Sequence, residues 1–204
     1  EKINSFIINW SDPDNEIIDG EKKRYDPETT VVEDCLPHFL SLLRIFTSLT
    51  IVNYDSLIFQ RGGSKISLNF KSDLKKLRFN ISRKAATRER LIIINTKTAE
   101  YQINFSNELP VIKKNNELYE IDYETKLYNR PMARMIKAFF EAIDQNKYIK
   151  ELDIHYGLEI SKLTEKIMVD YLKLQKIWLK KSTNINLKSE NVRMYKEYAL
   201  KEDS

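Results

Sequence analysis

Cysteine, glycine and proline are all scarce in this 204-residue chain, which holds one cysteine, four glycines and five prolines. A single cysteine excludes an internal disulfide, and the chain has no cluster of cysteines and histidines with the spacing of zinc ligands. Few glycines and prolines beside 42% apolar residues are typical of an ordered globular protein, not of a linker. The length allows one domain with a real core, with or without an appended arm.

Concentrated charge and long apolar runs are missing as well. The net charge is +4, from 34 basic and 30 acidic residues that are mixed along the sequence. Nucleic-acid binding usually needs a concentrated basic face, so this class is not expected. No run of about 18 apolar residues is present, which argues against a membrane span. With the single cysteine, these features predict a soluble protein of the reducing cytoplasm.

The chain also lacks an initial methionine and a signal segment. It starts at Glu1 and runs directly into Ile3–Trp10, which has the composition of a β-strand. A strand at the very start of a chain, with no leader, is typical of a piece cut from a longer polypeptide. We therefore expect this sequence to be a fragment.

The elements that are present follow a clear order along the chain. A polar, turn-rich stretch from Ser11 to Thr30 is long for a structureless connection, and such loops are often functional. An apolar helix is expected from Val31 to Thr47. Period-two alternation then predicts strands between residues 49 and 105, with a tight hairpin at Gly62 and Gly63. The last third has helical periodicity, with one helix around 132–143 and a longer one after Gly157.

This order predicts an α+β fold with a mostly antiparallel open sheet, arranged as a meander, and helices packed on one face. The other face of the sheet is polar and uncovered. We expect it to pair with a second copy of the chain, because an open sheet face suits an isologous contact. Residues 1–180 are expected to form this domain. Residues 181–204 are expected to form a charged C-terminal arm, with a short helix that begins at Ser189.

The segment from Asp34 to His38 carries the best candidate chemistry. Residues four apart share a face of a helix, so a carboxylate and an imidazole would point the same way. Such a pair suits acid/base work or the binding of a polyol, because a carboxylate can orient the ring and raise its basicity. The plain alternative is that Asp34 caps the helix and that Pro37 lies in its first turn.

Other candidates have plain alternatives that we favour. Tyr25 in the long loop either reaches a ligand or packs on the rim of the sheet. His155 is expected at a helix entry, and Cys35 as a buried, inert thiol. A basic cluster is either a solvated hairpin turn or a grip for the phosphate of a nucleotide-sugar, and two further arginines flank a helix start. These residues are Arg83, Lys84, Arg88 and Arg90 in the cluster, and Arg130 and Arg134 at the helix.

Taken together, these motifs resemble the C-terminal domain of the Gfo/Idh/MocA family of glucose–fructose oxidoreductases and inositol dehydrogenases. Its members typically carry Asp-x-Gly-x-His-x-x-Asp at the start of this helix. Asp34 and His38 match that pattern, whereas Leu36 replaces the glycine and Ser41 replaces the second aspartate. Two later segments resemble the closing helices of the family, Pro131–Ile143 and Gly157–Ile167.

The resemblance implies an NAD(P)-dependent oxidoreductase that acts on a sugar, a polyol or a nucleotide-sugar. In the family, the histidine at the position of His38 approaches the substrate hydroxyl and assists proton transfer. Asp34 would orient this ring or bind a hydroxyl, and Tyr25 and Ser41 are further candidates for substrate contact. The hydride passes to a nicotinamide, and a lysine from the nucleotide-binding domain is the usual partner in acid/base chemistry.

The sequence departs from the family where the cofactor is concerned. It contains neither a Gly-x-Gly-x-x-Gly turn nor the Glu-Lys-Pro motif that supplies the family's lysine. NAD or NADP would therefore be bound mainly by an absent N-terminal domain, and no cofactor or metal is expected in this chain. The alternative function is a non-enzymatic protein-interaction module that uses the open sheet face. Nucleic-acid binding through the sheet ranks last, because it needs aromatic residues among basic ones on the exposed face. The alternation instead places Phe70, Phe79 and Phe105 on the same face as the aliphatic residues.

Overall fold

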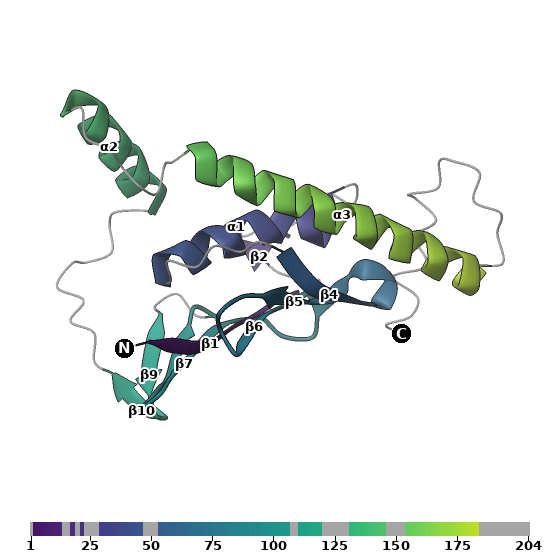
Figure 1. Cartoon of the computed structure of the whole chain (residues 1–204), viewed down its shortest axis with the longest axis horizontal. Helices are drawn as coiled ribbons and strands as arrows, with labels where there is room; N and C mark the ends of the chain where they lie inside the picture. The colour runs from purple at the N-terminus through teal and green to yellow at the C-terminus, as the bar shows by residue number, and fades with distance from the viewer. Residues whose placement is uncertain are drawn as a thin grey trace.

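The computed structural model describes residues 2–13, 17–18, 21–22, 29–46, 53–106, 110–119, 131–145 and 154–183. They form an eight-stranded open sheet with two helices lying across one of its faces (Figure 1). The α+β class predicted from the sequence is confirmed. The strands of the sheet are β1 (Ile3–Pro13), β4 (Asn53–Gln60), β5 (Lys65–Lys71), β6 (Lys76–Ala85), β7 (Glu89–Thr96), β8 (Glu100–Asn104), β9 (Val111–Lys114) and β10 (Glu117–Tyr119).

The remaining elements are three helices, one short turn of helix and a small ladder. The helices are α1 (Val31–Phe46), α2 (Pro131–Asp144) and α3 (Ile154–Thr183), and the 3-10 turn is η1 (Arg61–Gly63). Strands β2 (Ile17–Ile18) and β3 (Glu21–Lys22) pair with each other within the long loop. α2 lies apart from the sheet and from the other two helices (Figure 1).

The strand order is β10-β9-β8-β7-β1-β6-β5-β4. β1 lies between β7 and β6; it is antiparallel to β7 and parallel to β6. The sheet is therefore mostly antiparallel, as predicted, but the predicted meander is interrupted by the first strand. Alternation of side chains fixes which face of a strand is buried, whereas it does not fix which strand is the neighbour. β9 and β10 are also additions to the prediction, and Asn115 and Asn116 join them with positive φ angles.

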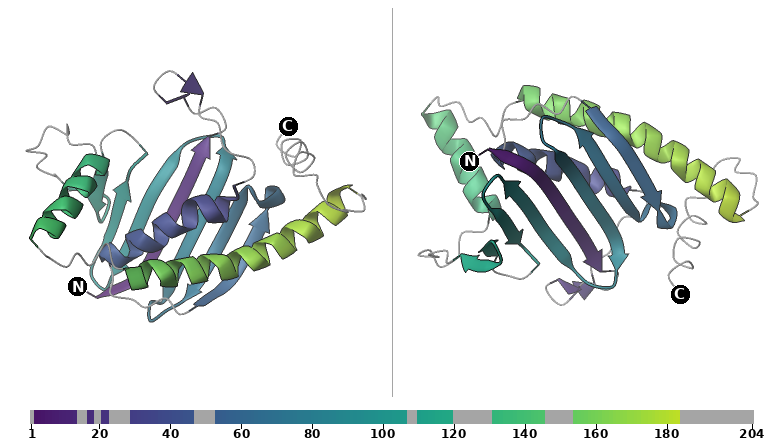
Figure 2. Two further views of the ribbon diagram at one scale, coloured as in Figure 1. Left: turned by 90° about the horizontal axis from the view of Figure 1, so that it is seen from above. Right: turned by 60° about the horizontal axis from the view of Figure 1, so that its bottom comes forward.

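One face of the sheet is covered by α1 and α3, and the core lies between these layers (Figure 2). The alternating residues of β1, β5, β6 and β7 point into this core, and so do the apolar residues of α1. Aromatic rings link the layers, because Phe39 of α1 packs against Trp10 and Phe79 at centroid distances of 5.2 and 5.9 Å. The largest fully buried side chains include Phe6, Ile8, Leu36, Phe39, Leu40, Leu43, Ile66, Leu68, Leu77, Phe79, Ile81 and Ile92.

Thr30, the residue just before α1, forms a capping box with Glu33 in the first turn of the helix. The backbone N–H of Glu33 donates to Oγ1 of Thr30 at 3.1 Å, and the backbone N–H of Thr30 donates back to the Glu33 carboxylate at 2.9 Å. This reciprocal pair satisfies two N–H groups that a helix start leaves without partners. Thr30, not Asp34, is therefore the cap, and Pro37 lies inside the helix, not in its first turn.

α3 crosses beside α1 and buries Leu163, Ile167 and Tyr171. Three tyrosine hydroxyls fix its position. That of Tyr156 donates to the Leu40 carbonyl at 2.7 Å, that of Tyr171 donates to the Gly63 carbonyl at 3.3 Å, and that of Tyr54 in β4 donates to Asp170. The helix starts at Ile154, so Gly157 lies within it and not before it. The C-terminal arm was predicted over residues 181–204. α3 ends at Thr183, within that range, and residues 184–204 lie outside the described residues.

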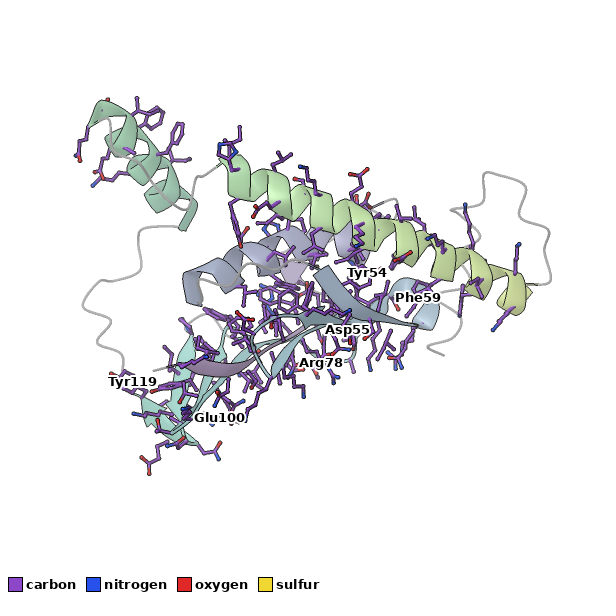
Figure 3. All side chains as sticks on the ribbon, in the orientation of Figure 1. Tyr54, Asp55, Phe59, Arg78, Glu100 and Tyr119 are labelled. Atoms are coloured by element: carbon purple, nitrogen blue, oxygen red, sulfur yellow. The ribbon has the colours of Figure 1, made fainter. Side chains whose placement is uncertain are left out.

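The second face of the sheet is not covered by any described helix (Figure 3). Its side chains form cross-strand hydrogen bonds, in which Asn80 accepts from Ser67 and donates to Asn9, both at 2.8 Å. Arg78 donates to Asn69 at 2.6 Å in the neighbouring row. Ile7 of β1 and Ile93 of β7 face each other across the strands between these polar residues. This open sheet face has the polar character predicted from the alternation.

Candidate functional site

The exposed face of α1 brings three of the four predicted site residues together. Asp34, His38 and Ser41 are all exposed, and their spacing of four and three residues places them in one row along the helix. The hydroxyl of Ser41 donates to the Pro37 carbonyl at 2.8 Å, which satisfies it within the helix. The fourth predicted residue, Tyr25, lies outside the described residues.

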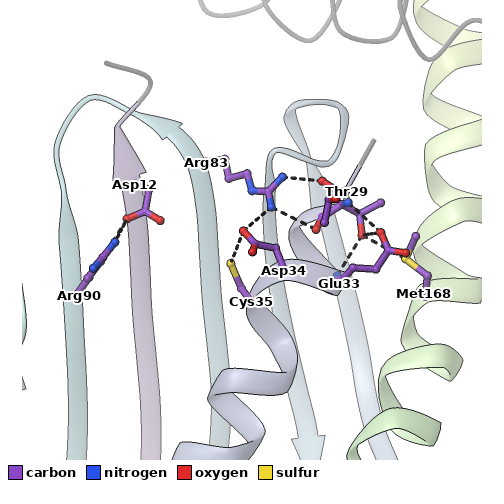
Figure 4. Close-up of polar contacts among 9 residues, drawn as sticks. Asp12, Thr29, Glu33, Asp34, Cys35, Arg83, Arg90 and Met168 are labelled. Atoms are coloured by element: carbon purple, nitrogen blue, oxygen red, sulfur yellow. Dashed lines mark hydrogen bonds and ion pairs between the residues drawn. The ribbon is translucent and has the colours of Figure 1, made fainter. Parts of the chain in front are cut away.

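Asp34 is held by an arginine from the sheet (Figure 4). Nη2 of Arg83, near the end of β6, lies 2.6 Å from Oδ2 of Asp34. The same guanidinium donates to the carbonyls of Thr29 at 2.7 Å and Thr30 at 3.4 Å. The Arg83 side chain is only 13% exposed, whereas Asp34 is 47% exposed. The ion pair therefore joins a mostly buried cation to a carboxylate at the surface.

This pairing argues against two of the roles considered for Asp34, as the cap of α1 and as the group that orients the ring of His38. The carboxylate does not cap α1, and its Oδ2 is directed to Arg83, not to the ring of His38. No hydrogen bond joins Asp34 to His38 in the described part of the chain. The remaining oxygen, Oδ1, makes no hydrogen bond to another described residue. The row on α1 thus presents an acceptor oxygen and an imidazole side by side, both accessible to an added molecule.

Cys35 is a buried thiol, as predicted. It is 8% exposed, and its Sγ lies 3.8 Å from Oδ2 of Asp34. Burial, followed by the negative charge of Asp34, raises the pKa of the Cys35 thiol to about 12. The thiolate is the reactive form, so this cysteine is not a nucleophile near neutral pH.

Two arginines of the predicted basic cluster form ion pairs, and the side chain of Lys84 lies outside the described residues. Besides the Arg83 pair, Nη2 of Arg90 lies 2.8 Å from Oδ1 of Asp12, which is buried. The guanidinium of Arg90 also lies 4.5 Å from the ring centroid of Trp10, in cation–π geometry. Both arginines therefore have carboxylate partners, which weakens the interpretation of the cluster as a phosphate grip. Arg88 is exposed in the turn before β7.

The other candidate residues either lie at the surface or fall outside the described residues. His155 is exposed in the first turn of α3, in agreement with a helix-entry residue. Arg130 and the side chain of Arg134 lie outside the described residues. Within the described ranges, no group of three His, Cys, Asp or Glu residues is placed to hold a metal ion. None of the described helices is long and apolar enough to cross a membrane.

Sequence reasoning named Arg83 only as a member of a basic turn and missed its role as the partner of Asp34. A signal for it is present in the alternation of β6. Leu77, Phe79 and Ile81 point into the core, and Arg83 continues the same register. A charged residue at a core-facing position needs a partner of opposite charge, because burial without one is costly. Arg90 continues the buried register of Ile92 and Ile94 in the same way, and it too has a carboxylate partner.

Comparison with known proteins supports the fold and leaves the activity open. No protein-family model matches the sequence, and no curated protein matches it. Among solved structures, 23 chains match. The UDP-N-acetylglucosamine 3-dehydrogenase GnnA from Acidithiobacillus ferrooxidans matches with a TM-score of 0.62 and 15% identity, over 82% of this chain and 52% of its own.

Two further matches have the same character. A Gfo/Idh/MocA family oxidoreductase from Vibrio cholerae gives a TM-score of 0.56 at 12% identity, over 84% of this chain and 53% of its own. A levoglucosan dehydrogenase in complex with NADH and L-sorbose gives 0.60 at 12% identity, over 84% and 57%. The chain thus has the fold of part of the Gfo/Idh/MocA oxidoreductases and spans about half the length of these structures. The resemblance in the motifs is confirmed at the level of the fold.

Proposed function

We propose that this chain is the substrate-binding and oligomerisation domain of a cytoplasmic, NAD(P)-dependent oxidoreductase that acts on a sugar, a polyol or a nucleotide-sugar. The observation that carries the proposal is the exposed row of Asp34 and His38 on α1, in a fold shared with sugar dehydrogenases. The carboxylate oxygen accepts a hydrogen bond from a ligand hydroxyl. The imidazole of His38 lies in the same row and exchanges a proton with the hydroxyl that reacts. Tyr25 and Ser41 contribute further contacts to the sugar.

The described residues do not fit a dinucleotide cofactor by themselves. The adjacent glycines Gly62 and Gly63 belong to a 3-10 turn between two strands and do not open an α-helix, which is where a pyrophosphate binds. A Cβ added to Gly62 would lie 3.0 Å from the ring of Trp178, so this turn is filled by a side chain. We assign the nicotinamide cofactor, and the hydride step with it, to a nucleotide-binding part that this chain does not contain.

The open sheet face is the proposed surface for pairing with a second copy of the chain. Its polar side chains bond to one another across the strands, as Asn9, Asn80 and Ser67 do. These groups have little need of water, so they enter an interface at a low desolvation cost. The apolar pair of Ile7 and Ile93 lies among them. A flat face of this kind matches itself about a two-fold axis.

The test is turnover by the complete natural polypeptide that contains this chain. We expect reduction of NAD⁺ or NADP⁺ with a sugar from the panel UDP-N-acetylglucosamine, levoglucosan and L-sorbose. His38→Ala should lower kcat about 10²–10⁴-fold, which is the usual contribution of a general acid/base group. His155→Ala removes the other histidine, exposed at the start of α3, and should leave the rate unchanged.

Two results would contradict this function. If the natural polypeptide proves to have no nucleotide-binding part and reduces neither cofactor, the interaction module becomes the better description. If turnover is present and His38→Ala retains the wild-type rate, the proton-transfer role is wrong.

A further inference from the structure

Arg83 has an unusual place for a charged side chain. It continues the core-facing register of β6 after Leu77, Phe79 and Ile81, and it is 13% exposed. A guanidinium stays charged at any accessible pH, so it is stable in such a position only if acceptors surround it. The acceptors come from the segment that enters α1, far away in the sequence (Figure 4).

Three acceptors of Arg83 belong to this segment, and they are of two kinds. The carbonyl oxygens of Thr29 and Thr30 belong to the backbone just before α1, at 2.7 and 3.4 Å. The third acceptor is Oδ2 of Asp34, at 2.6 Å, one turn into the helix. A guanidinium is planar and its N–H groups point in fixed directions, so these contacts are coupled. One side chain from the sheet therefore fixes both the entry of α1 and the orientation of the Asp34 carboxylate.

The contact with Arg83 affects the exposed row of α1, because it determines which oxygen of Asp34 is left for a ligand. Arg83 and the thiol of Cys35 both donate to Oδ2 of Asp34. The other oxygen, Oδ1, belongs to a side chain that is 47% exposed, in the same row as His38. We propose that Arg83 is a positioning residue, which holds Asp34 so that Oδ1 accepts a hydrogen bond from a hydroxyl of the sugar bound at His38. This inference rests on the proposed function.

A purely structural role for the ion pair makes a different prediction. If Arg83 only anchored the start of α1, its loss would lower the stability and would leave the affinity for the sugar unchanged in the folded fraction. Arg83→Lys separates the two roles, because lysine keeps the charge but a single ammonium does not reproduce the forked contact. Thr30→Ala is the matched control, since it weakens the same helix start by removing the hydroxyl that accepts from the Glu33 N–H, and it leaves the Asp34 carboxylate and both carbonyls in place.

The experiment compares KM and kcat of the complete polypeptide, using whichever sugar of the panel it turns over. We expect Arg83→Lys to raise KM for the sugar about tenfold, the effect of weakening one hydrogen bond to a charged group. kcat should change by less than about twofold, because the contact is made equally to substrate and transition state. Thr30→Ala should lower the thermal midpoint and leave KM at the wild-type value.

A double variant shows whether Arg83 acts through Asp34. Asp34→Ala alone should raise KM, and adding Arg83→Lys to it should cause no further rise, because the two changes remove one interaction. The inference is overturned if Arg83→Lys leaves KM unchanged, if Thr30→Ala raises KM to the same extent, or if the two single effects multiply in the double variant. Absence of turnover with every sugar, or full activity of His38→Ala, would instead contradict the proposed function itself.

Discussion

At the scale of single residues, Cys35 gives a prediction that needs no substrate. Burial and the nearby Asp34 carboxylate raise the pKa of its thiol from an ordinary value of 9.0 to about 12. The folded state thus holds this proton more tightly than the unfolded state. The contribution to stability is complete below pH 9 and falls as the pH rises toward 12, by about 1.4 kcal/mol per pH unit.

The measurement is urea unfolding at pH 7 and pH 10, together with the rate of alkylation by iodoacetamide. The wild-type chain should lose more stability between these pH values than Cys35→Ala, and its thiol should react quickly only in denaturant. Rapid alkylation of the folded chain at pH 8 would show that the thiol is not buried as described.

The residue scale also shows what sequence reasoning reached at the candidate site. The spacing of Asp34, His38 and Ser41 was enough to place them in one exposed row, because helical periodicity is local. The partner of Asp34 was not predicted, since Arg83 lies 49 residues away and reaches it only through the packing of α1 on the sheet. Local rules describe the row itself, whereas the orientation of a carboxylate within it depends on tertiary contacts.

At the scale of elements, the contact between α3 and η1 gives a testable prediction. Gly62 has φ of +59°, and the ring of Trp178 covers the position where a Cβ would be. Gly62→Ala should therefore lower the free energy of unfolding by about 1–3 kcal/mol, through backbone strain and the clash together. In a Trp178→Ala background the clash is gone, so the same substitution should cost less, about 1 kcal/mol for strain alone.

This prediction is checked by chemical unfolding of the four chains of the cycle. Gly157→Ala is the matched control, because Gly157 lies in the first turn of α3 with no atom within 4 Å of an added Cβ. It should be neutral or slightly stabilising, since alanine is the better helix former. Equal costs for Gly62→Ala with and without Trp178 would show that the ring does not pack there.

Elements that carry a strong local pattern were predicted well. The strands from β4 to β8 and the helix α1 follow directly from periods of two and 3.6 residues. The start of α1 at Val31 was predicted correctly, whereas the cap was considered only at Asp34, although Thr30 and Glu33 have the spacing of a capping box. β9 and β10 were missed because each is short and mostly exposed, so neither has an apolar face that would show as alternation.

At the scale of the whole molecule, the insertion of β1 between β6 and β7 defines the architecture. This insertion brings residues 3–13 into the centre of the sheet. The three-stranded block β6-β5-β4 and the four-stranded block β7-β8-β9-β10 are therefore joined through the N-terminal strand. The position of β1 was not predictable from alternation, since a strand has the same pattern of apolar and polar residues at the edge of a sheet and in its centre. It also determines the composition of the open sheet face, because Ile7 and Asn9 contribute to the middle of that surface.

The open sheet face yields the last prediction, on assembly. A charge at its centre should prevent two copies from stacking, because an arginine there is desolvated without a partner. We expect the natural polypeptide to sediment as a dimer or a larger even assembly, and Ile93→Arg to shift it to half that mass. Val169→Arg is the control, since Val169 is 50% exposed on α3, on the opposite side of the molecule. It should leave the mass unchanged, and urea unfolding of both variants should confirm that each remains folded. A wild-type monomer at every concentration, or a dimer that Val169→Arg disrupts and Ile93→Arg does not, would show that copies of the chain do not pair through this face.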